Sequence, residues 1–272
     1  MPPDSSSFTA LNIPPSAVPE WMGSFSLAAP PNTDLWRKPP SRDTSTAPIL
    51  YTALRNPFIA AEVTVSADWE LEWDQGGLVI FAGAPPGRIG ESAVQTGSAT
   101  GSATVSATGT AAATSTTAGV GAVAAVVGAA AAAQGDAPPA YVPPAPASKW
   151  VKVGLEFCNN ACHATSVCAT ADGADWALTA LPPHHARRLD LRVKLERIGY
   201  ALWIWYEDEV SGWKTLREVT WFFWGVEDKA VRVGVYASRP ANFGSTHYER
   251  RHGGPSVTQR NLCVDFEGLE IF

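Results

Sequence analysis

Three carboxylates occupy alternate positions in one short stretch, Glu70, Glu72 and Asp74. On a β-strand, side chains two positions apart share a face, so neighbouring carboxylates would lie about 6–7 Å apart. That separation suits the acid and the partner carboxylate of a glycoside hydrolase. Trp69 and Trp73 flank and interrupt the pattern, which favours a solvated strand face that leads into a turn. We keep the hydrolase as the enzymatic alternative.

A second set of polar side chains alternates along residues 150–157. One face carries Trp150, Lys152 and Glu156, with Gly154 leaving a gap, and the other face is an unbroken apolar row. Because side chains alternate across a strand, we expect the apolar row to face a core and the polar row to face a wetter surface. Lys152 and Glu156 lie about 13 Å apart along one strand, so each needs a partner from elsewhere.

One interpretation of this polar row is a ligand groove. A sugar or a similar ligand needs a flat ring to stack on and a few fixed polar groups to orient it. Trp203 and Trp205 share one face of a later strand and could add rings to the groove. The predicted ligand-binding residues are therefore Asp74, Trp150, Lys152, Glu156 and Trp203.

The other interpretation is structural, since buried charges are usually paired whatever their role. Arg192 and Arg197 are possible partners for Glu156, and Asp74 is a possible partner for Lys152. In that case the pairs fix the register of the strands and the tryptophan rings belong to the core. The sequence leaves both interpretations open.

Cysteine and histidine residues give no clear metal or nucleophile pattern. Cys158, Cys162 and His163 are grouped, but their spacing is poor for zinc and no second ligand pair follows. The N-terminus has neither the basic nor the apolar region of a secretory signal. We therefore expect reduced thiols in a cytoplasmic protein, with no metal and no cofactor.

Composition narrows the range of partners. The chain has 272 residues, 46% of them hydrophobic, and a formal net charge of -6. Nucleic acids and anionic membranes need a basic surface, so neither is an expected partner. No glycine-rich phosphate loop joins a strand to a helix. The eleven tryptophans suit a packed β-protein with some rings lining a binding surface.

Strand-like stretches recur on both sides of a low-complexity segment, and no convincing amphipathic helix appears outside it. The predicted strands are 58–65, 69–74, 77–82, 150–157, 164–170, 176–178, 189–196, 200–206, 213–219, 231–236 and 263–271. Many short strands without helices predict an all-β sandwich of two antiparallel sheets.

Residues 88–148 are rich in Ala, Ser, Thr, Gly and Pro, and we expect a disordered insertion there. Its most apolar part, 119–133, is too short and too weakly apolar to span a membrane. We expect a flexible N-terminal arm over 1–20 and one sandwich domain over 21–272. The insertion is then a long loop of this domain, and the strands on its two sides must pair.

Several motifs together resemble a concanavalin A-like family of unknown function that includes the fungal regulation-of-enolase proteins. The motifs are Asp34–Arg37, Asp74–Leu78, Trp150-x-Lys152-x-Gly154-x-Glu156-Phe157, Ser166–Thr170, Asp175-Trp176, Arg197, Trp213, Arg217 and Gly234-x-Tyr236-Ala237-Ser238-x-Pro240. The resemblance covers about 21–87 and 149–272, and the insertion departs from it. It implies a jelly-roll sandwich with one concave sheet, and no settled activity.

We therefore expect a non-enzymatic binding or regulatory module. Its partner would be a carbohydrate, bound on a concave sheet, or a metabolic enzyme that it regulates. The alternatives are a hydrolase that uses Glu70, Glu72 and Asp74, and a sandwich with a purely structural role.

Overall fold

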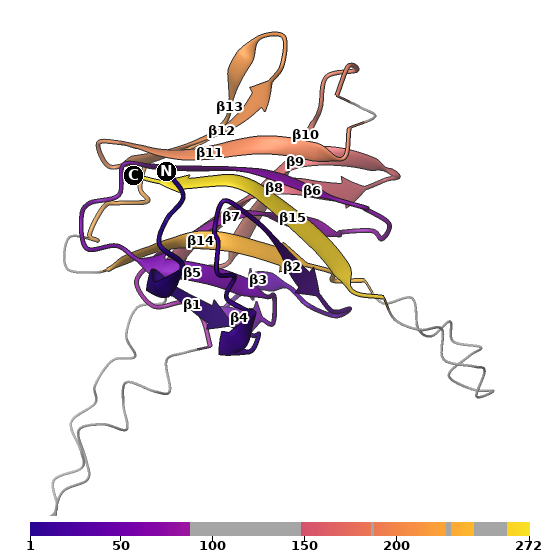
Figure 1. Cartoon of the computed structure of the whole chain (residues 1–272). Coiled ribbons are helices and arrows are strands. Elements are labelled where there is room, and N and C mark those ends of the chain that lie inside the picture. Colours follow the sequence, from indigo (N-terminus) through magenta and orange to yellow (C-terminus); the bar gives the residue numbers. More distant parts are fainter. Residues whose placement is uncertain (88–147, 186–187, 227–229, 242–259) are drawn as a thin grey trace, which may run out of the picture. The chain divides into compact units, whose positions relative to one another are not determined.

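The computed structural model describes residues 1–87, 148–185, 188–226, 230–241 and 260–272. Two antiparallel sheets face each other in one compact unit (Figure 1). In the seven-stranded sheet the order is β1 (Phe8–Leu11), β5 (Ile49–Ala53), β14 (Val231–Ser238), β7 (Gln75–Ala82), β8 (Lys149–Cys158), β9 (Ala161–Ala169) and β10 (Ala174–Ala180). In the six-stranded sheet it is β13 (Gly212–Val219), β12 (Ala201–Asp208), β11 (Asp190–Ile198), β6 (Ala60–Ala67), β15 (Leu262–Ile271) and β2 (Ser24–Ala29).

The main core lies between the two sheets and follows from alternating apolar residues. On β8, Val151, Val153 and Leu155 are fully buried in this core, as the apolar row predicts. On β11, Leu191, Val193 and Leu195 alternate with charged neighbours on the outer face. The predicted all-β sandwich of two antiparallel sheets, a jelly roll, is confirmed.

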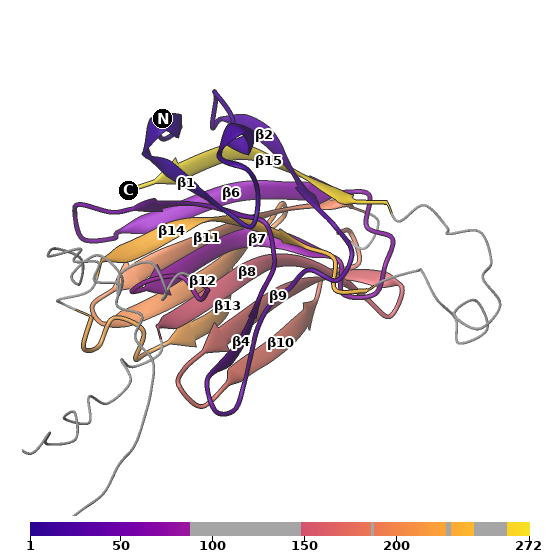
Figure 2. The ribbon, with the colours of Figure 1, turned by 90° about the horizontal axis from the view of Figure 1, so that it is seen from below.

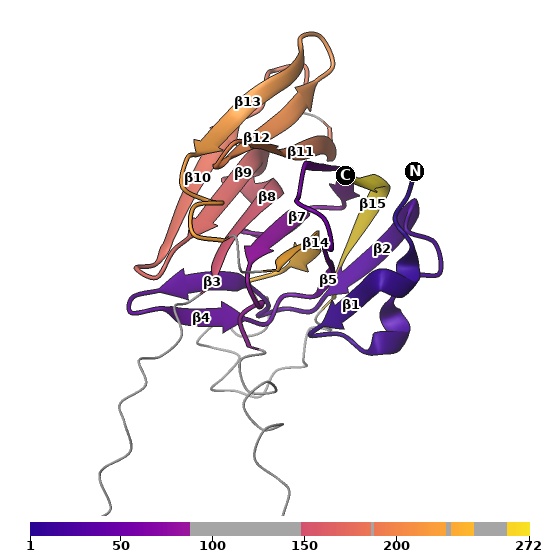
Figure 3. The same ribbon diagram turned by 90° about the vertical axis from the view of Figure 1, so that its left-hand side faces the viewer.

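A second, smaller core covers the outer face of the seven-stranded sheet. The hairpin of β3 (Leu35–Lys38) and β4 (Arg42–Ser45) lies on the side of this sheet away from the six-stranded one (Figure 3). Seen from below, the hairpin passes over the β9–β10 end of the sheet (Figure 2). The buried residues of this second core are Leu11, Leu35, Ala47, Ile49, Tyr51, Val79, Phe81, Trp150, Val167, Ala169 and Tyr236.

The strands on the two sides of the insertion pair directly. In the β7–β8 ladder, Ala82 lies opposite Lys149 and Gln75 lies opposite Glu156. The insertion therefore connects two neighbouring antiparallel strands of one sheet, as predicted. Residues 88–147 lie outside the described residues. The structure therefore does not test the disorder expected over 88–148.

Two expectations differ from the structure. The N-terminal arm contains β1, in which Phe8 and Ala10 are buried and the strand pairs with β5. This alternating apolar pattern ties the arm to the sheet. The expected strand over 69–74 is an irregular turn, in which Trp73 has a left-handed backbone (φ 68°) far from the extended conformation of a strand. Within the described residues, no helix has the length and apolarity that a membrane crossing requires.

Candidate functional site

A cavity of about 440 Å³ opens on the outer face of the seven-stranded sheet, beside the second core. Its size is within the range of pockets for small molecules. The lining combines three indoles with several charged groups: Asp34, Trp36, Lys38, Trp73, Gln75, Lys152, Glu156, Val167, Trp176 and Pro240. Lys152 and Glu156 of the predicted polar row therefore share one cavity, and we call it the β8 cavity.

Lys152 is fully buried, and its charge is balanced from outside the sheet. Its Nζ lies 3.1 Å from Oδ1 of Asp34, and it sits 5.4 Å from the centre of the Tyr236 ring. Asp34 immediately precedes β3, so the covering hairpin supplies the counter-ion. The expected partner, Asp74, does not contact Lys152, because another cation holds it.

Glu156 lies on the floor of the β8 cavity and is 1% exposed. Its Oε2 accepts hydrogen bonds from Thr165 Oγ1 at 2.7 Å and from Trp176 Nε1 at 3.1 Å. Burial raises the pKa of this carboxyl above its ordinary value, and the two hydrogen bonds and the Lys152 charge oppose that rise.

The arginines expected to pair with Glu156 face elsewhere. Arg192 binds Glu62 at 2.7 Å, and Arg197 donates to the Gly199 carbonyl at 2.9 Å. Both belong to β11, which lies in the six-stranded sheet. The two sheets place their outer faces on opposite sides of the core, so these arginines cannot reach the cavity.

Two half-exposed indoles flank the cavity. Trp73 is 48% exposed and Trp176 is 42% exposed, both high for a tryptophan. Trp73 N donates to the Phe157 carbonyl at 2.8 Å, which fixes its left-handed turn against the end of β8. A non-glycine residue in this conformation is costly, and such strain gathers at ligand sites.

Asp74 anchors the turn that presents Trp73. Its two oxygens bind Arg239 at 2.7 and 2.8 Å, and Oδ2 also accepts the backbone N–H groups of Glu70 and Leu71. Asp74 and Arg239 are both buried, so the pair is a scaffold below the cavity. Asp74 was expected to bind the ligand; it lies between two residues that line the cavity, Trp73 and Gln75, and does not line the cavity itself.

Trp150 and Trp203 lie outside the cavity. Trp150 is fully buried in the second core, with the Arg37 guanidinium 5.9 Å from its ring centre. Trp203 belongs to β12 in the other sheet, where it stacks on Trp205 with ring centres 5.5 Å apart. A ligand in the β8 cavity contacts neither ring.

The other two carboxylates of the 69–74 stretch do not converge with Asp74. Glu72 accepts hydrogen bonds from Cys158 Sγ and Asn159 N, both at 3.1 Å, at the β8–β9 turn. Glu70 is half exposed, with Oε2 3.7 Å from Arg239 Nη2. The alternation expected of a strand is absent, so this stretch does not form the carboxylate face that the hydrolase alternative requires.

Sequence reasoning missed Asp34, Trp73 and Trp176 as site residues. Asp34 and Trp176 are both in the motifs that carry the family resemblance, and this was the available signal. Asp34 reaches Lys152 because the hairpin covers this face of the sheet, and Trp176 lies beside Glu156 because β9 joins β10 to β8. Both arrangements depend on the tertiary fold.

The sequence matches the model of a family described as "Protein of unknown function (DUF1349)" over residues 11–252, and the chain belongs to this family. A relative from Emericella nidulans, "Uncharacterized protein AN7484", is 30% identical over 221 residues. The match spans 81% of this chain and 79% of that protein.

Among solved structures, a functionally unknown protein from Saccharomyces cerevisiae is similar, with a TM-score of 0.57 and 17% identity. The match covers 99% of this chain and 98% of that one, and it supports the fold alone. A mutant of the GH43 protein BlXynB from Bacillus licheniformis scores 0.48 at 11% identity, and this chain spans 35% of its length. LamAcat from Zobellia galactanivorans has a TM-score of 0.44 at 11% identity, and the match covers 100% of this chain and 92% of that one.

Proposed function

We propose that this protein is a non-enzymatic binding module of the cytoplasm that holds a carbohydrate in the β8 cavity. The observation that carries the proposal is the pairing of two half-exposed indoles, Trp73 and Trp176, with buried charges on the cavity floor. Sugar rings have apolar C–H faces that stack on indole and hydroxyls that need fixed donors and acceptors.

The polar groups offer both kinds of hydrogen-bond partner. Lys152 Nζ is a donor, and the carboxylates of Asp34 and Glu156 are acceptors. All three are already held by protein contacts, so a ligand would meet groups that need little reordering. Four free thiols, two of them buried, are compatible with a reducing compartment.

A glycan array with the wild-type protein, followed by calorimetry on each glycan that binds, tests the proposal. We expect Trp73→Ala to weaken binding at least about fivefold, since truncating a central aromatic contact typically costs more than 1 kcal/mol. Trp21→Ala is the matched control, because Trp21 is 62% exposed and does not line the cavity.

If the wild type binds no glycan on the array, the proposal that the cavity holds a carbohydrate is wrong. Equal binding by Trp73→Ala and the wild type would also reject it. The metabolic-enzyme partner implied by the family resemblance would then be the candidate, to be sought by affinity capture with wild-type protein and with a cavity variant.

A further inference from the structure

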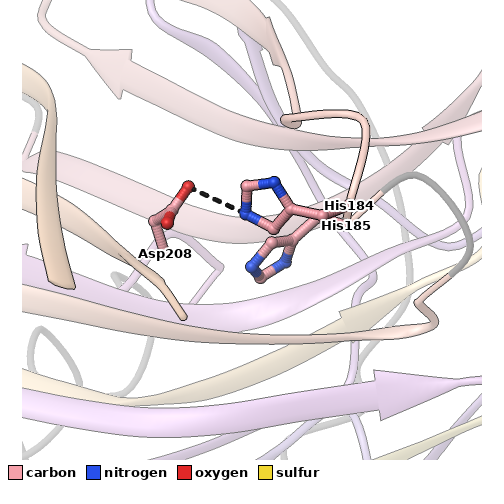
Figure 4. A group of neighbouring side chains, drawn as sticks. All are labelled: His184, His185 and Asp208. Atoms are coloured by element: carbon pink, nitrogen blue, oxygen red, sulfur yellow. Dashed lines mark ion pairs between the residues drawn. The ribbon is translucent and has the colours of Figure 1, made fainter. Parts of the chain in front are cut away.

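A cluster of two histidines and an aspartate stands apart from the β8 cavity. His184 and His185 are in the connection between β10 and β11, and Asp208 is the last residue of β12. One ring nitrogen of each histidine and one carboxylate oxygen of Asp208 all lie within 4.8 Å of one another (Figure 4). Among the described residues, this is the one group of three such side chains close enough to share a metal ion.

The aspartate is held in place with one oxygen available. Asp208 Oδ1 accepts the backbone N–H groups of Val210 and Ser211, both at 2.8 Å. Oδ2 points to His184 Nε2 at 3.3 Å. Ligand atoms around a tetrahedral zinc ion, with bonds of about 2.0–2.1 Å, are separated by about 3.3 Å. This pair therefore already has the spacing of two ligands of one ion.

The second histidine supplies an independent observation. His185 is 3% exposed, and its Nδ1 has no hydrogen-bond partner among the described residues. Its Nε2 receives only a long contact, 3.4 Å, from Glu209 N. A buried imidazole with so little hydrogen bonding is unusual, because buried polar groups are normally satisfied.

One cationic side chain, Arg188, acts on the cluster. It is paired with Asp190 at 2.5 Å and with Glu209, so its positive charge opposes a bound cation only weakly.

We propose that His184, His185 and Asp208 form a binding site for a divalent transition metal, with Zn²⁺ as the principal ion. Imidazole nitrogen and carboxylate oxygen are ligands that suit zinc, and also nickel and cobalt. Three protein ligands leave a position for water, and the side chain of His184, 41% exposed, lies on the open side. The ion ties the β10–β11 connection to the β12–β13 hairpin. This proposal departs from the expectation, drawn from the sequence, that the chain holds no metal.

Calorimetric titration of the metal-free protein with ZnCl₂ tests the site. We expect one site per chain in the wild type, weakened about tenfold or more in His184→Gln and in Asp208→Asn. Asn keeps an oxygen for the Val210 and Ser211 N–H groups, so Asp208→Asn tests the ligand without removing the turn. Melting curves in EDTA should agree between these variants and the wild type.

Two further measurements separate this site from other zinc ligands. His163→Gln is the matched control, since His163 is part-exposed and outside the cluster, and it should bind like the wild type. Co²⁺ in place of Zn²⁺ should give a spectrum without a thiolate charge-transfer band. The proposal fails if the wild type does not bind, if His184→Gln and Asp208→Asn bind as the wild type does, or if the spectrum shows thiolate ligands.

Discussion

Glu156 is the residue at which the stability of the fold most clearly opposes the proposed binding role. Its carboxyl is buried on the cavity floor, and that burial raises its pKa. A group that only served the fold would be better replaced by a neutral one of the same shape, since an ionised carboxylate loses hydration when it is buried. The charge is thus a cost to the fold that a ligand can offset.

Glu156→Gln should therefore stabilise the protein at neutral pH. The folded pKa lies above the unfolded value of about 4.5, so wild-type stability falls as pH rises from that value through the folded pKa. Glutamine does not titrate and keeps an acceptor for Thr165 and Trp176. We expect a higher Tm than the wild type at pH 7 and a gap that shrinks toward about pH 4.5.

The measurement is a series of thermal melts across this pH range, with Glu267→Gln as the control at an exposed position. A variant less stable than the wild type by the same amount at every pH would contradict the account.

Lys152 and Glu156 could be found from the sequence because an alternating row reveals which side chains share a face. Their partners could not be found in this way. Asp34, the partner of Lys152, precedes a hairpin that folds over the sheet. Asp74, the expected partner, instead pairs with Arg239, which lies 165 positions away along the chain. Charges that pair over such separations leave no local pattern.

At the scale of elements, the turn before β7 depends on the buried pair of Asp74 and Arg239. The pair joins this turn to the end of β14, and Arg239 Nη1 also donates to the Arg260 carbonyl at 2.8 Å. The buried Asp74–Arg239 pair, which does not line the cavity, thus fixes the turn that carries the indole of Trp73.

Arg239→Met should lower the free energy of unfolding by about 3–5 kcal/mol, because it leaves the Asp74 carboxylate buried without its cation. Urea unfolding measures the loss. Arg192→Met, which removes a half-exposed ion pair with Glu62, is the matched control and should cost less than about 1 kcal/mol. Equal losses of unfolding free energy in the two variants would show that burial does not increase the contribution of the Asp74–Arg239 pair to stability.

The strands of the main core could be predicted because their alternation of apolar and polar residues is strong, as in β11 and β6. The hairpin β3–β4 and the strands β1, β2 and β5 were missed. β5 is buried on both faces over Ile49–Thr52, so it shows no alternation, and its apolar run is short. The hairpin carries polar residues because one side of it faces solvent.

At the scale of the whole molecule, the sheet pairs β7 with β8 directly, and no residue of the segment 88–147 takes part in that pairing. Ala82 and Lys149 face each other at its two ends, so a short loop can connect them. Removal of residues 88–147 should leave the fold intact and raise the free energy of unfolding by about 2 kcal/mol, since a shorter loop has less closure entropy to lose.

The shortened protein should unfold in one transition, observed by circular dichroism, and retain the ligand affinity of the full chain. Loss of cooperative unfolding would mean that the segment contributes to the core. Retained folding with lost affinity would place part of the ligand site within the segment.

The order of strands also bears on when the protein can fold during its synthesis. β14 lies between β5 and β7, and β15 lies between β6 and β2, although both strands come from the last 42 residues. Until these residues leave the ribosome, four strands made much earlier lack a neighbour and expose unpaired backbone N–H and C=O groups. The two sheets can therefore be completed only after residue 271 has left the ribosome, and until then the nascent chain carries open sheet edges that can pair with other chains.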